Sequence, residues 1–226
     1  MTNPFINFKK RDWLLWGVSL TAVIISNVFN SNFDMITFIA TVIGATALIL
    51  AAKGHVLSPV LLAVFSMLYA VISFRFHYWG EMITYLGMTL PMNILAIISW
   101  VRNPSENEGE VQISKVSARA KVVSAVLTVL ITTAFYFILS ALDTPNIVFS
   151  TISVTTSFAA AAMTMLRSSY YAFWYAWNDI VLIILWIMAS VEDPVYIPVV
   201  VNFTIFFIND IYGFYSWKKR EKSMNL

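Results

Sequence analysis

The sequence contains no cysteine, and only 12% of its 226 residues are charged. The missing cysteine excludes thiolate catalysis and metal sites built on thiolate ligands. The shortage of charge says more, because a soluble domain typically carries about 25% charged residues. Hydrophobic residues make up 59% of the chain, and the mean hydropathy is +0.76. These values favour a membrane protein over a soluble one before any single segment is considered.

Motifs of nucleotide and hydrolytic chemistry are also missing. No GxxxxGK[ST] sequence is present, so the chain has no loop of its own for hydrolysing a nucleotide. No Ser-His-Asp arrangement can be argued, and His55 and His77 fall at the ends of apolar segments without the spacing of metal ligands. We therefore expect no enzyme activity, no cofactor, no metal and no nucleic-acid partner.

Eight long apolar segments follow one another, separated by short polar gaps. Backbone groups inside a bilayer must be paired within the protein, and these runs are too continuous for the alternating strands of a barrel. The sequence thus predicts an all-α integral membrane protein with eight transmembrane helices. Their expected ranges are 12–29, 35–53, 56–75, 80–101, 119–141, 146–166, 169–190 and 195–218.

The basic residues predict the orientation of these spans. If the N-terminus is cytoplasmic, every Lys and Arg except Arg75 falls in an inner region, which agrees with the positive-inside rule. Eight spans then return the basic C-terminus to the cytoplasm. Lys9, Lys10 and Arg11 precede an apolar run without a small-x-small cleavage pattern, so we expect a first span rather than a cleaved signal peptide.

A weak internal repeat divides the chain. Ser99-Trp100 and Ser216-Trp217 end the fourth and eighth spans at an offset of 117 residues, and the same offset approximately relates the starts of the preceding spans. Two parallel copies of a three-helix unit need one inverting helix between them. The predicted organisation is an extra span (1–34), a first repeat (35–101), an inner loop with a linker helix (102–141), a second repeat (142–218) and a basic cytoplasmic tail (219–226).

Two further expectations concern the inner side of the membrane. The loop 102–118 carries Glu106, Glu108 and Glu110 and is expected to be a solvated linker. Trp100 and Trp217 are expected at the inner interface, where Trp side chains commonly anchor helices.

The segment "FWYAWND" (173–179), followed by a last span that ends "IYGFYSWKK" (211–219), resembles the PnuC-type vitamin transporters. The resemblance covers spans two to eight, although the first repeat ends in "AIISW" (96–100) rather than in a Gly-containing sequence. It implies a fold related to the SWEET sugar carriers, with two parallel three-helix repeats and a substrate site near the middle of the membrane. The implied substrate is nicotinamide riboside, whereas close relatives of the family carry thiamine or riboflavin.

The seventh span holds the strongest site candidates. Asp179 lies near the middle of an apolar segment, where a carboxylate facing lipid costs on the order of 2.5 kcal/mol or more, so it must face protein or a water-filled cavity. Trp174, Trp177 and Asn178 share one helix face at i, i+3 and i+4. The indoles could stack on a cationic ring, and Asn178 could bind a carboxamide or a ribose hydroxyl. The alternative is that these residues only pack the helices together.

Two other spans supply further candidates for substrate binding. In the last span Asn202 and Asn209 lie a heptad apart on one face, and Tyr212 flanks its inner end. The offset of 117 makes the fourth span the partner of the last one. Its candidates are Tyr85, Thr89 and Asn93. Hydrogen bonds between packed helices are again the alternative.

The combined expectation is a multi-pass transporter of a bacterial inner membrane that takes up nicotinamide riboside by facilitated diffusion. Its partners would be the small-molecule substrate and the lipid bilayer, with a cytosolic kinase that traps the substrate without binding to the transporter. Whether the chain forms a homo-oligomer is left open. The alternatives are transport of thiamine or riboflavin, and a substrate-binding subunit of an ATP-driven vitamin importer.

Overall fold

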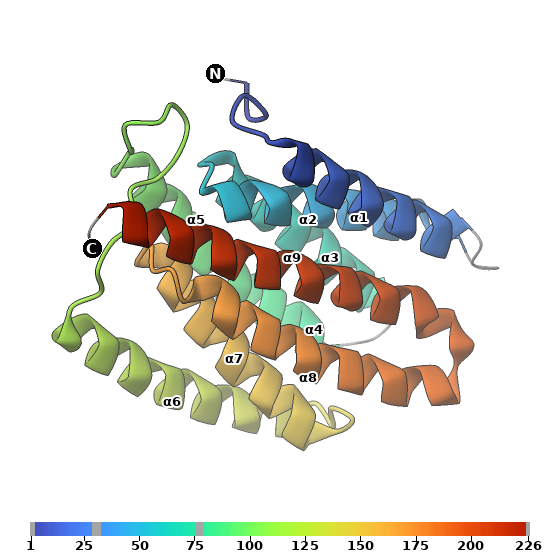
Figure 1. Cartoon of the computed structure of the whole chain (residues 1–226). Coiled ribbons are helices and arrows are strands. Elements are labelled where there is room, and N and C mark those ends of the chain that lie inside the picture. Colours follow the sequence, from blue (N-terminus) through green and yellow to red (C-terminus); the bar gives the residue numbers. More distant parts are fainter. Residues whose placement is uncertain (1–2, 29–32, 76–78, 225–226) are drawn as a thin grey trace.

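The computed structural model describes residues 3–28, 33–75 and 79–224, and this part of the chain is almost entirely helical (Figure 1). In chain order the elements are α1 (Lys10–Val28), α2 (Met35–Lys53), α3 (Leu57–Arg75), α4 (Trp79–Thr84), a π-helical segment (Tyr85–Thr89), α5 (Leu90–Val101), α6 (Ala118–Ala141), α7 (Ile147–Met165), α8 (Tyr171–Glu192), a short 3₁₀ turn (Pro194–Tyr196) and α9 (Ile197–Ser223). The predicted all-α architecture is confirmed.

Seven helical stretches of the described residues are long and apolar enough to cross a membrane. They are α2, α3, the continuous stretch from α4 to α5, α6, α7, α8 and the stretch from the 3₁₀ turn through α9. The predicted count of eight is not confirmed. The expected first span is helical as α1, but Lys10, Arg11 and Asp12 occupy its first turn and make it less apolar. Residue 29, the last of that predicted span, lies outside the described residues.

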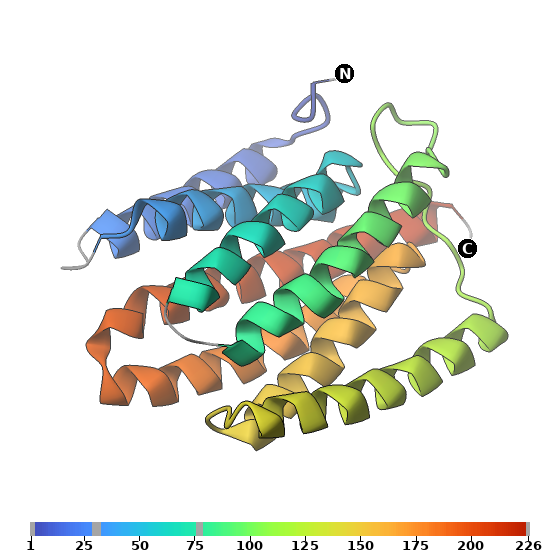
Figure 2. The same cartoon turned by 180° about the vertical axis from the view of Figure 1, so that it is seen from behind.

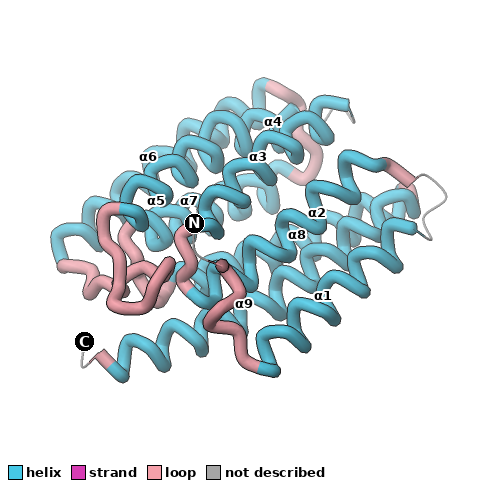
Figure 3. The backbone as a smooth tube through the Cα atoms, turned by 90° about the horizontal axis from the view of Figure 1, so that it is seen from above, coloured by secondary structure: helices cyan, strands magenta, loops and turns pink. Residues whose placement is uncertain are grey.

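Six of the seven stretches form a closed ring. α2 packs on α3, α3 on α5, α5 on α7, α7 on α8, α8 on α9, and α9 returns to α2. α1 lies outside this ring against α2 and α9, and α6 lies outside it against α7, as the view from behind also shows (Figure 2). α1 begins at the end of the bundle where α9 finishes, and we call this the basic end (Figure 3).

Small residues let the ring helices approach closely. Between Ala40 and Ala52, α2 buries mostly Ala, Gly and Thr, and α7 buries a run of Ala from residue 159 to 162. A Cβ atom on Gly44 would lie 2.8 Å from the Phe206 ring and 3.2 Å from the Phe65 ring. The close packing expected from small residues in membrane helices is therefore present at this crossing.

The loop that follows α5 differs from its prediction as a solvated linker. Glu106 and Glu108 are exposed, as expected, but Glu110, Val111 and Ile113 are buried. The loop folds back across the basic end of the ring, where the Val111 N–H donates to the Gly54 carbonyl over 2.8 Å. The acidic composition of the loop gives no indication of this burial, because the buried contacts of Glu110 come from residues far away in the sequence.

Replacing Gly44 with Val should overpack the crossing of α2 with α3 and α9. We expect a loss of about 1–3 kcal/mol in the free energy of unfolding, the usual cost of extra methyl groups in a packed core. Gly17→Val is the matched control, because no atom lies within 4 Å of the position that its Cβ would take. Thermal unfolding of the two purified variants measures the difference. Equal losses would show that helix propensity rather than packing sets the cost.

Candidate functional site

The centre of the ring contains a cavity that all six ring stretches line. It comprises about 790 Å³ of space not filled by atoms, open solvent included. Phe65, Phe203, Phe206 and Trp100 supply aromatic rings to its wall. Its polar lining consists of Ser58, Ser66, Tyr85, Thr89, Asn93, Ser157, Thr164, Tyr171, Tyr175, Asn178, Asp179 and Asp210.

Asn178 is held rigidly at this wall by α7. Its side-chain oxygen accepts hydrogen bonds from Thr156 and Ser157, each over 2.9 Å, and from Ser153 over 3.3 Å. Three hydroxyl donors occupy the oxygen, so the amide nitrogen is the group that Asn178 can offer to a ligand. The run of Ser and Thr in α7 therefore orients this residue.

Asp179 of α8 and Asp210 of α9 line the cavity together, close enough for their carboxyl groups to interact electrostatically. Each residue is only 3% exposed, and one oxygen of Asp179 is buried without a hydrogen-bond partner among the described residues. Two ionised carboxylates in contact repel each other strongly. The pair therefore suits a positively charged group placed beside it in the cavity.

A π-helical turn brings Tyr85, Thr89 and Asn93 to the opposite wall. The Leu90 N–H donates to the Tyr85 carbonyl, five residues back, and Pro91 supplies no N–H to the following turn. Residues eight apart in a regular α-helix are about 80° apart around its axis. The wider turn reduces this rotation, and all three predicted residues line the cavity.

The contacts of these residues define what they can bind. The amide nitrogen of Asn93 donates to the Ser66 hydroxyl over 3.2 Å. The rings of Tyr85 and Tyr69 lie with centroids 4.4 Å apart, which fixes the tyrosine against α3. Tyr85 can present its ring to a flat ligand, and Asn93 keeps its side-chain oxygen as an acceptor.

The structure places the two predicted stacking residues elsewhere. Trp174 and Trp177 are 36% and 48% exposed and do not line the cavity, so the prediction that they share the cavity face with Asn178 is wrong for this geometry. The inward face of α8 is centred on Tyr175, and Trp177 lies about 200° from it around the helix. Tyr171 and Tyr175, which the sequence reasoning missed, line the cavity instead. Their spacing of four residues from each other and from Asp179 was an available signal.

The candidates of the last span also face away from the central cavity. Asn202 lies at a second cavity and donates to the Thr41 hydroxyl over 3.2 Å. Asn209 donates to the Ser19 hydroxyl of α1 over 2.9 Å, and the Tyr212 hydroxyl donates to Asp12 of the same helix. The hydrogen bonds of Asn209 and Tyr212 join α9 to α1, which fits the alternative in which these residues pack helices together.

The second cavity lies towards the end opposite the basic end. It comprises about 870 Å³ of space, open solvent included, between α1, α2, α3, α8 and α9. Phe65, Phe203 and Phe206 line both this cavity and the central one. The Phe206 ring lies 5.7 Å from that of Phe203 and 6.0 Å from that of Phe65, between centroids. These three rings, which we call the Phe partition, separate the two cavities.

Two Trp side chains close the central cavity towards the basic end. Trp100 and Trp217 are fully buried, with ring centroids 5.6 Å apart, so the prediction that they anchor at the membrane interface is wrong. The Trp100 indole N–H donates to the Thr164 carbonyl and that of Trp217 to the Ala51 carbonyl, each over 2.8 Å. These bonds replace the interfacial water that an anchoring Trp would use.

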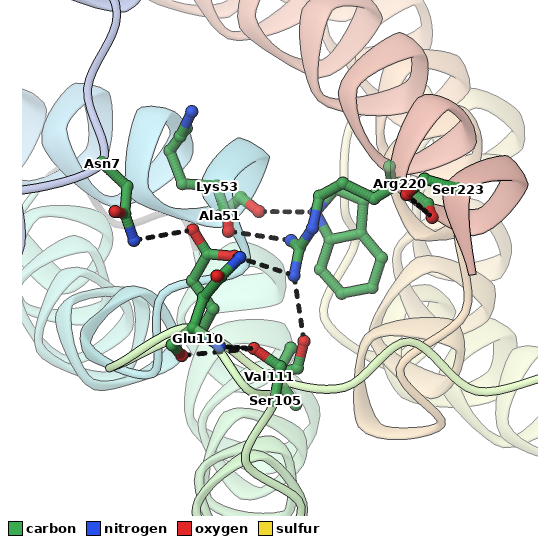
Figure 4. Close-up of polar contacts among 10 residues, drawn as sticks. Asn7, Ala51, Lys53, Ser105, Glu110, Val111, Arg220 and Ser223 are labelled. Carbon is green, nitrogen blue, oxygen red and sulfur yellow. Dashed lines mark hydrogen bonds and ion pairs between the residues drawn. The ribbon is translucent and has the colours of Figure 1, made fainter.

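Arg220 lies at the same end, where it bonds to the end of α2 and to the loop after α5 (Figure 4). Its guanidinium donates to the Lys53 carbonyl over 2.8 Å and to the Val111 carbonyl over 3.1 Å, and it pairs with Glu110 over 3.2 Å. Asn7 also donates to Glu110, over 3.0 Å. Gly54 has φ +70°, and a side chain there would collide with the guanidinium. Arg220 thus joins α9, the end of α2 and the loop after α5, a set of contacts that we call the Arg220 clamp.

A metal site is not present among the described residues, which contain no group of three or more His, Asp or Glu side chains that could hold an ion. His55 is buried and accepts a hydrogen bond from the Leu57 N–H over 3.1 Å. His77 lies outside the described residues.

Comparisons with known proteins agree on one family. A family model described as nicotinamide mononucleotide transporter matches residues 34–219. A nicotinamide riboside transporter PnuC of Neisseria mucosa is 24% identical over 216 residues, covering 93% of this chain and 81% of the relative. One of Haemophilus influenzae is 24% identical over 193 residues, covering 84% and 82%.

The fold of this chain is also similar to that of a solved structure. The crystal structure of the vitamin B3 transporter PnuC superimposes with a TM-score of 0.83 at 20% sequence identity. The match covers 96% of this chain and 94% of that one.

Breaking the Arg220 clamp should open the cavity towards the basic end. The chain has no cysteine, so Thr164→Cys places a single thiol in the cavity wall. Hydrogen bonds to a charged group are worth roughly 1.5–3 kcal/mol, so Arg220→Met should raise the labelling rate by a membrane-impermeant maleimide about tenfold or more. Arg119→Met, which removes an exposed charge on α6, is the control and should change nothing. An unchanged rate in the folded Arg220 variant would contradict a closing role.

Proposed function

Because this chain belongs to the nicotinamide mononucleotide transporter family, whose members are membrane transporters and not enzymes, we propose that it carries nicotinamide riboside across a bacterial plasma membrane. The names of the two curated relatives support this substrate. The proposed site is the central cavity, with Tyr85, Thr89, Asn93, Asn178 and Asp179 among its substrate-binding residues.

The observation that carries the proposal is the carboxyl pair in an aromatic cavity. Nicotinamide riboside combines a positively charged pyridinium ring with a carboxamide and ribose hydroxyls. Asp179 and Asp210 offer negative charge to the ring, and the faces of Tyr85 and Tyr175 offer cation–π attraction of roughly 0.5–2 kcal/mol. The amide nitrogen of Asn178 suits the carboxamide oxygen or a ribose hydroxyl.

Charge separates one alternative substrate from the others. Riboflavin has a neutral ring system and would leave the carboxyl pair without a counter-charge, which disfavours it. Thiamine carries a cationic ring and fits the same electrostatic argument. The names of the relatives favour nicotinamide riboside over thiamine, and direct binding of the three vitamins decides between them.

We further propose that residues 35–101 and 142–218 are two parallel copies of a three-helix unit, with 102–141 as the linker. The two Trp hydrogen bonds support this. Trp100, near the end of the first copy, is bonded to α7 of the second, and Trp217, near the end of the second, is bonded to α2 of the first. Residues 1–34 and 219–226 then lie outside both copies.

The transport step is proposed to be facilitated diffusion, with the basic end in the cytoplasm. Opening the Phe partition would connect the central cavity to the outside, and opening the Arg220 clamp would connect it to the inside. No nucleotide-binding loop is present in the sequence to supply energy. The membrane potential favours entry of a monovalent cation by about 2.3 kcal/mol per 100 mV, and phosphorylation by a cytosolic kinase would retain it.

Asp179→Asn should weaken binding of nicotinamide riboside by about tenfold or more, because the pyridinium loses a buried counter-charge worth roughly 1.5–3 kcal/mol. Calorimetric titration of the purified protein measures this. Asp193→Asn, outside the cavity at the start of the 3₁₀ turn, is the control.

The reduced dihydro form of nicotinamide riboside has a neutral ring and should bind at least tenfold more weakly than the cation. Equal affinity for the two forms would rule out recognition of charge.

Uptake into proteoliposomes should reach equilibrium and stop when an ionophore holds the membrane voltage at zero. Neither ATP nor a pH gradient should then drive accumulation, because the proposed mechanism couples transport only to the substrate's own gradient and charge. Radiolabelled nicotinamide riboside inside the vesicles is the readout. Uphill accumulation after an imposed pH step, lost in Asp179→Asn, would contradict facilitated diffusion and make Asp179 a proton-binding residue.

A further inference from the structure

A cleft that the transport site does not use lies at the basic end. It comprises about 1,540 Å³ of space, open solvent included, between the start of α1 and the last turns of α9. Seven Lys or Arg side chains line it, and no acidic side chain does. We call it the basic cleft.

Three of the seven cations already have partners. Lys53 pairs with Asp12, Lys218 with Glu221 and Arg220 with Glu110. The other four are exposed, and none of them forms an ion pair with any residue in the described ranges 3–28, 33–75 and 79–224. They are Lys9, Arg11, Lys219 and Lys222.

Four unpaired cations in one concave surface repel one another. Arg11 also lies in the first turn of α1, where the helix dipole favours an anion rather than a cation. A bound anion would relieve both unfavourable interactions. The cleft is therefore built for an anionic ligand.

The depth of the cleft identifies the source of that anion. α9 has 27 residues and is about 40 Å long, whereas the hydrocarbon core of a bilayer is about 30 Å thick. About 20 residues of α9 cross the core, so the turns that carry Lys219 and Lys222 reach the head-group layer. Tyr215 lines the cleft and is 67% exposed, as is common for aromatic residues at this level.

An apolar path leads from the cleft towards the middle of the membrane. Tyr215, Ile211 and Ile208 are spaced by four and three residues and thus lie on one face of α9. Ile211 and Ile208 are 39% and 50% exposed. A lipid whose phosphate lies in the cleft can place an acyl chain along this face, which a soluble phosphate compound cannot use.

We propose that the basic cleft binds the phosphate head group of an anionic phospholipid, with Lys9, Arg11, Lys219 and Lys222 as its ligands. Basic pockets between helices at a membrane surface are suited to such head groups. The site is separate from the central cavity, and its occupation does not require a transported substrate.

Native mass spectrometry of the full chain, with phosphatidylglycerol or phosphatidylcholine added to the detergent, tests the proposal. Phosphatidylglycerol should be retained at least tenfold more strongly. Lys219→Gln with Lys222→Gln should weaken its retention by about 30-fold, the effect expected for two basic side chains near an anionic head group. The control is Arg119→Gln with Lys121→Gln, which removes two exposed charges from the start of α6, outside the cleft.

Retention by the control at the level of the unchanged protein supports a specific site. An equal loss in both double variants would overturn the proposal, because it would show a diffuse attraction by all the basic residues. No loss in either would overturn it too. A further arm adds glycerol phosphate, which has no acyl chains. Displacement of phosphatidylglycerol at an equal concentration would show that the cleft binds phosphate alone, and the assignment to a lipid would be wrong.

Discussion

A bilayer core offers no water to a polar side chain, and this constraint orders the whole ring of helices. Every polar group in the spanning stretches has to find a partner in the protein or face an internal cavity. The hydroxyls of α7 donate to the side-chain oxygen of Asn178, and Asp179 and Asp210 line the central cavity. The outer surface keeps apolar side chains, so the groups able to bind a ligand collect in the centre.

The two closures of the central cavity differ in chemistry. The Phe partition consists of three apolar rings that meet edge to face and carry no hydrogen bonds. The basic end is closed by indoles bonded to backbone carbonyls and by the Arg220 clamp, which depends on charge. When the rings of the Phe partition move, one apolar contact is exchanged for another. Movement of the second closure requires new partners for a guanidinium and a carboxylate, and water at the basic end can supply them.

The sequence predicts the seven stretches that can cross a membrane and the central placement of Asn178 and Asp179, because hydropathy and the cost of a buried carboxylate are local properties. It does not predict which face of α8 points inward. Aromatic residues occur all around that helix, so hydropathy does not separate Trp177 from Tyr175, and only the spacing of four residues between Tyr175 and Asp179 favours the tyrosine. The Arg220 clamp joins residues 110 positions apart, and the amide nitrogen of Asn209 donates to a side chain 190 positions away. Such contacts leave no mark in the local sequence.

The π-helical turn at Tyr85–Thr89 has a consequence for how this family can change over time. A π turn holds one residue more than an α turn, which is what a single-codon insertion into an existing helix produces. Removing that residue would restore a regular helix in which Tyr85 and Asn93 are seven positions apart and about 20° from each other around the axis, so both would still face the cavity. The π turn therefore lets the fourth span differ in length by one residue while the cavity wall keeps its orientation. A one-residue insertion or deletion elsewhere in this span, where no turn absorbs it, would rotate Tyr85 by about 100° relative to Asn93.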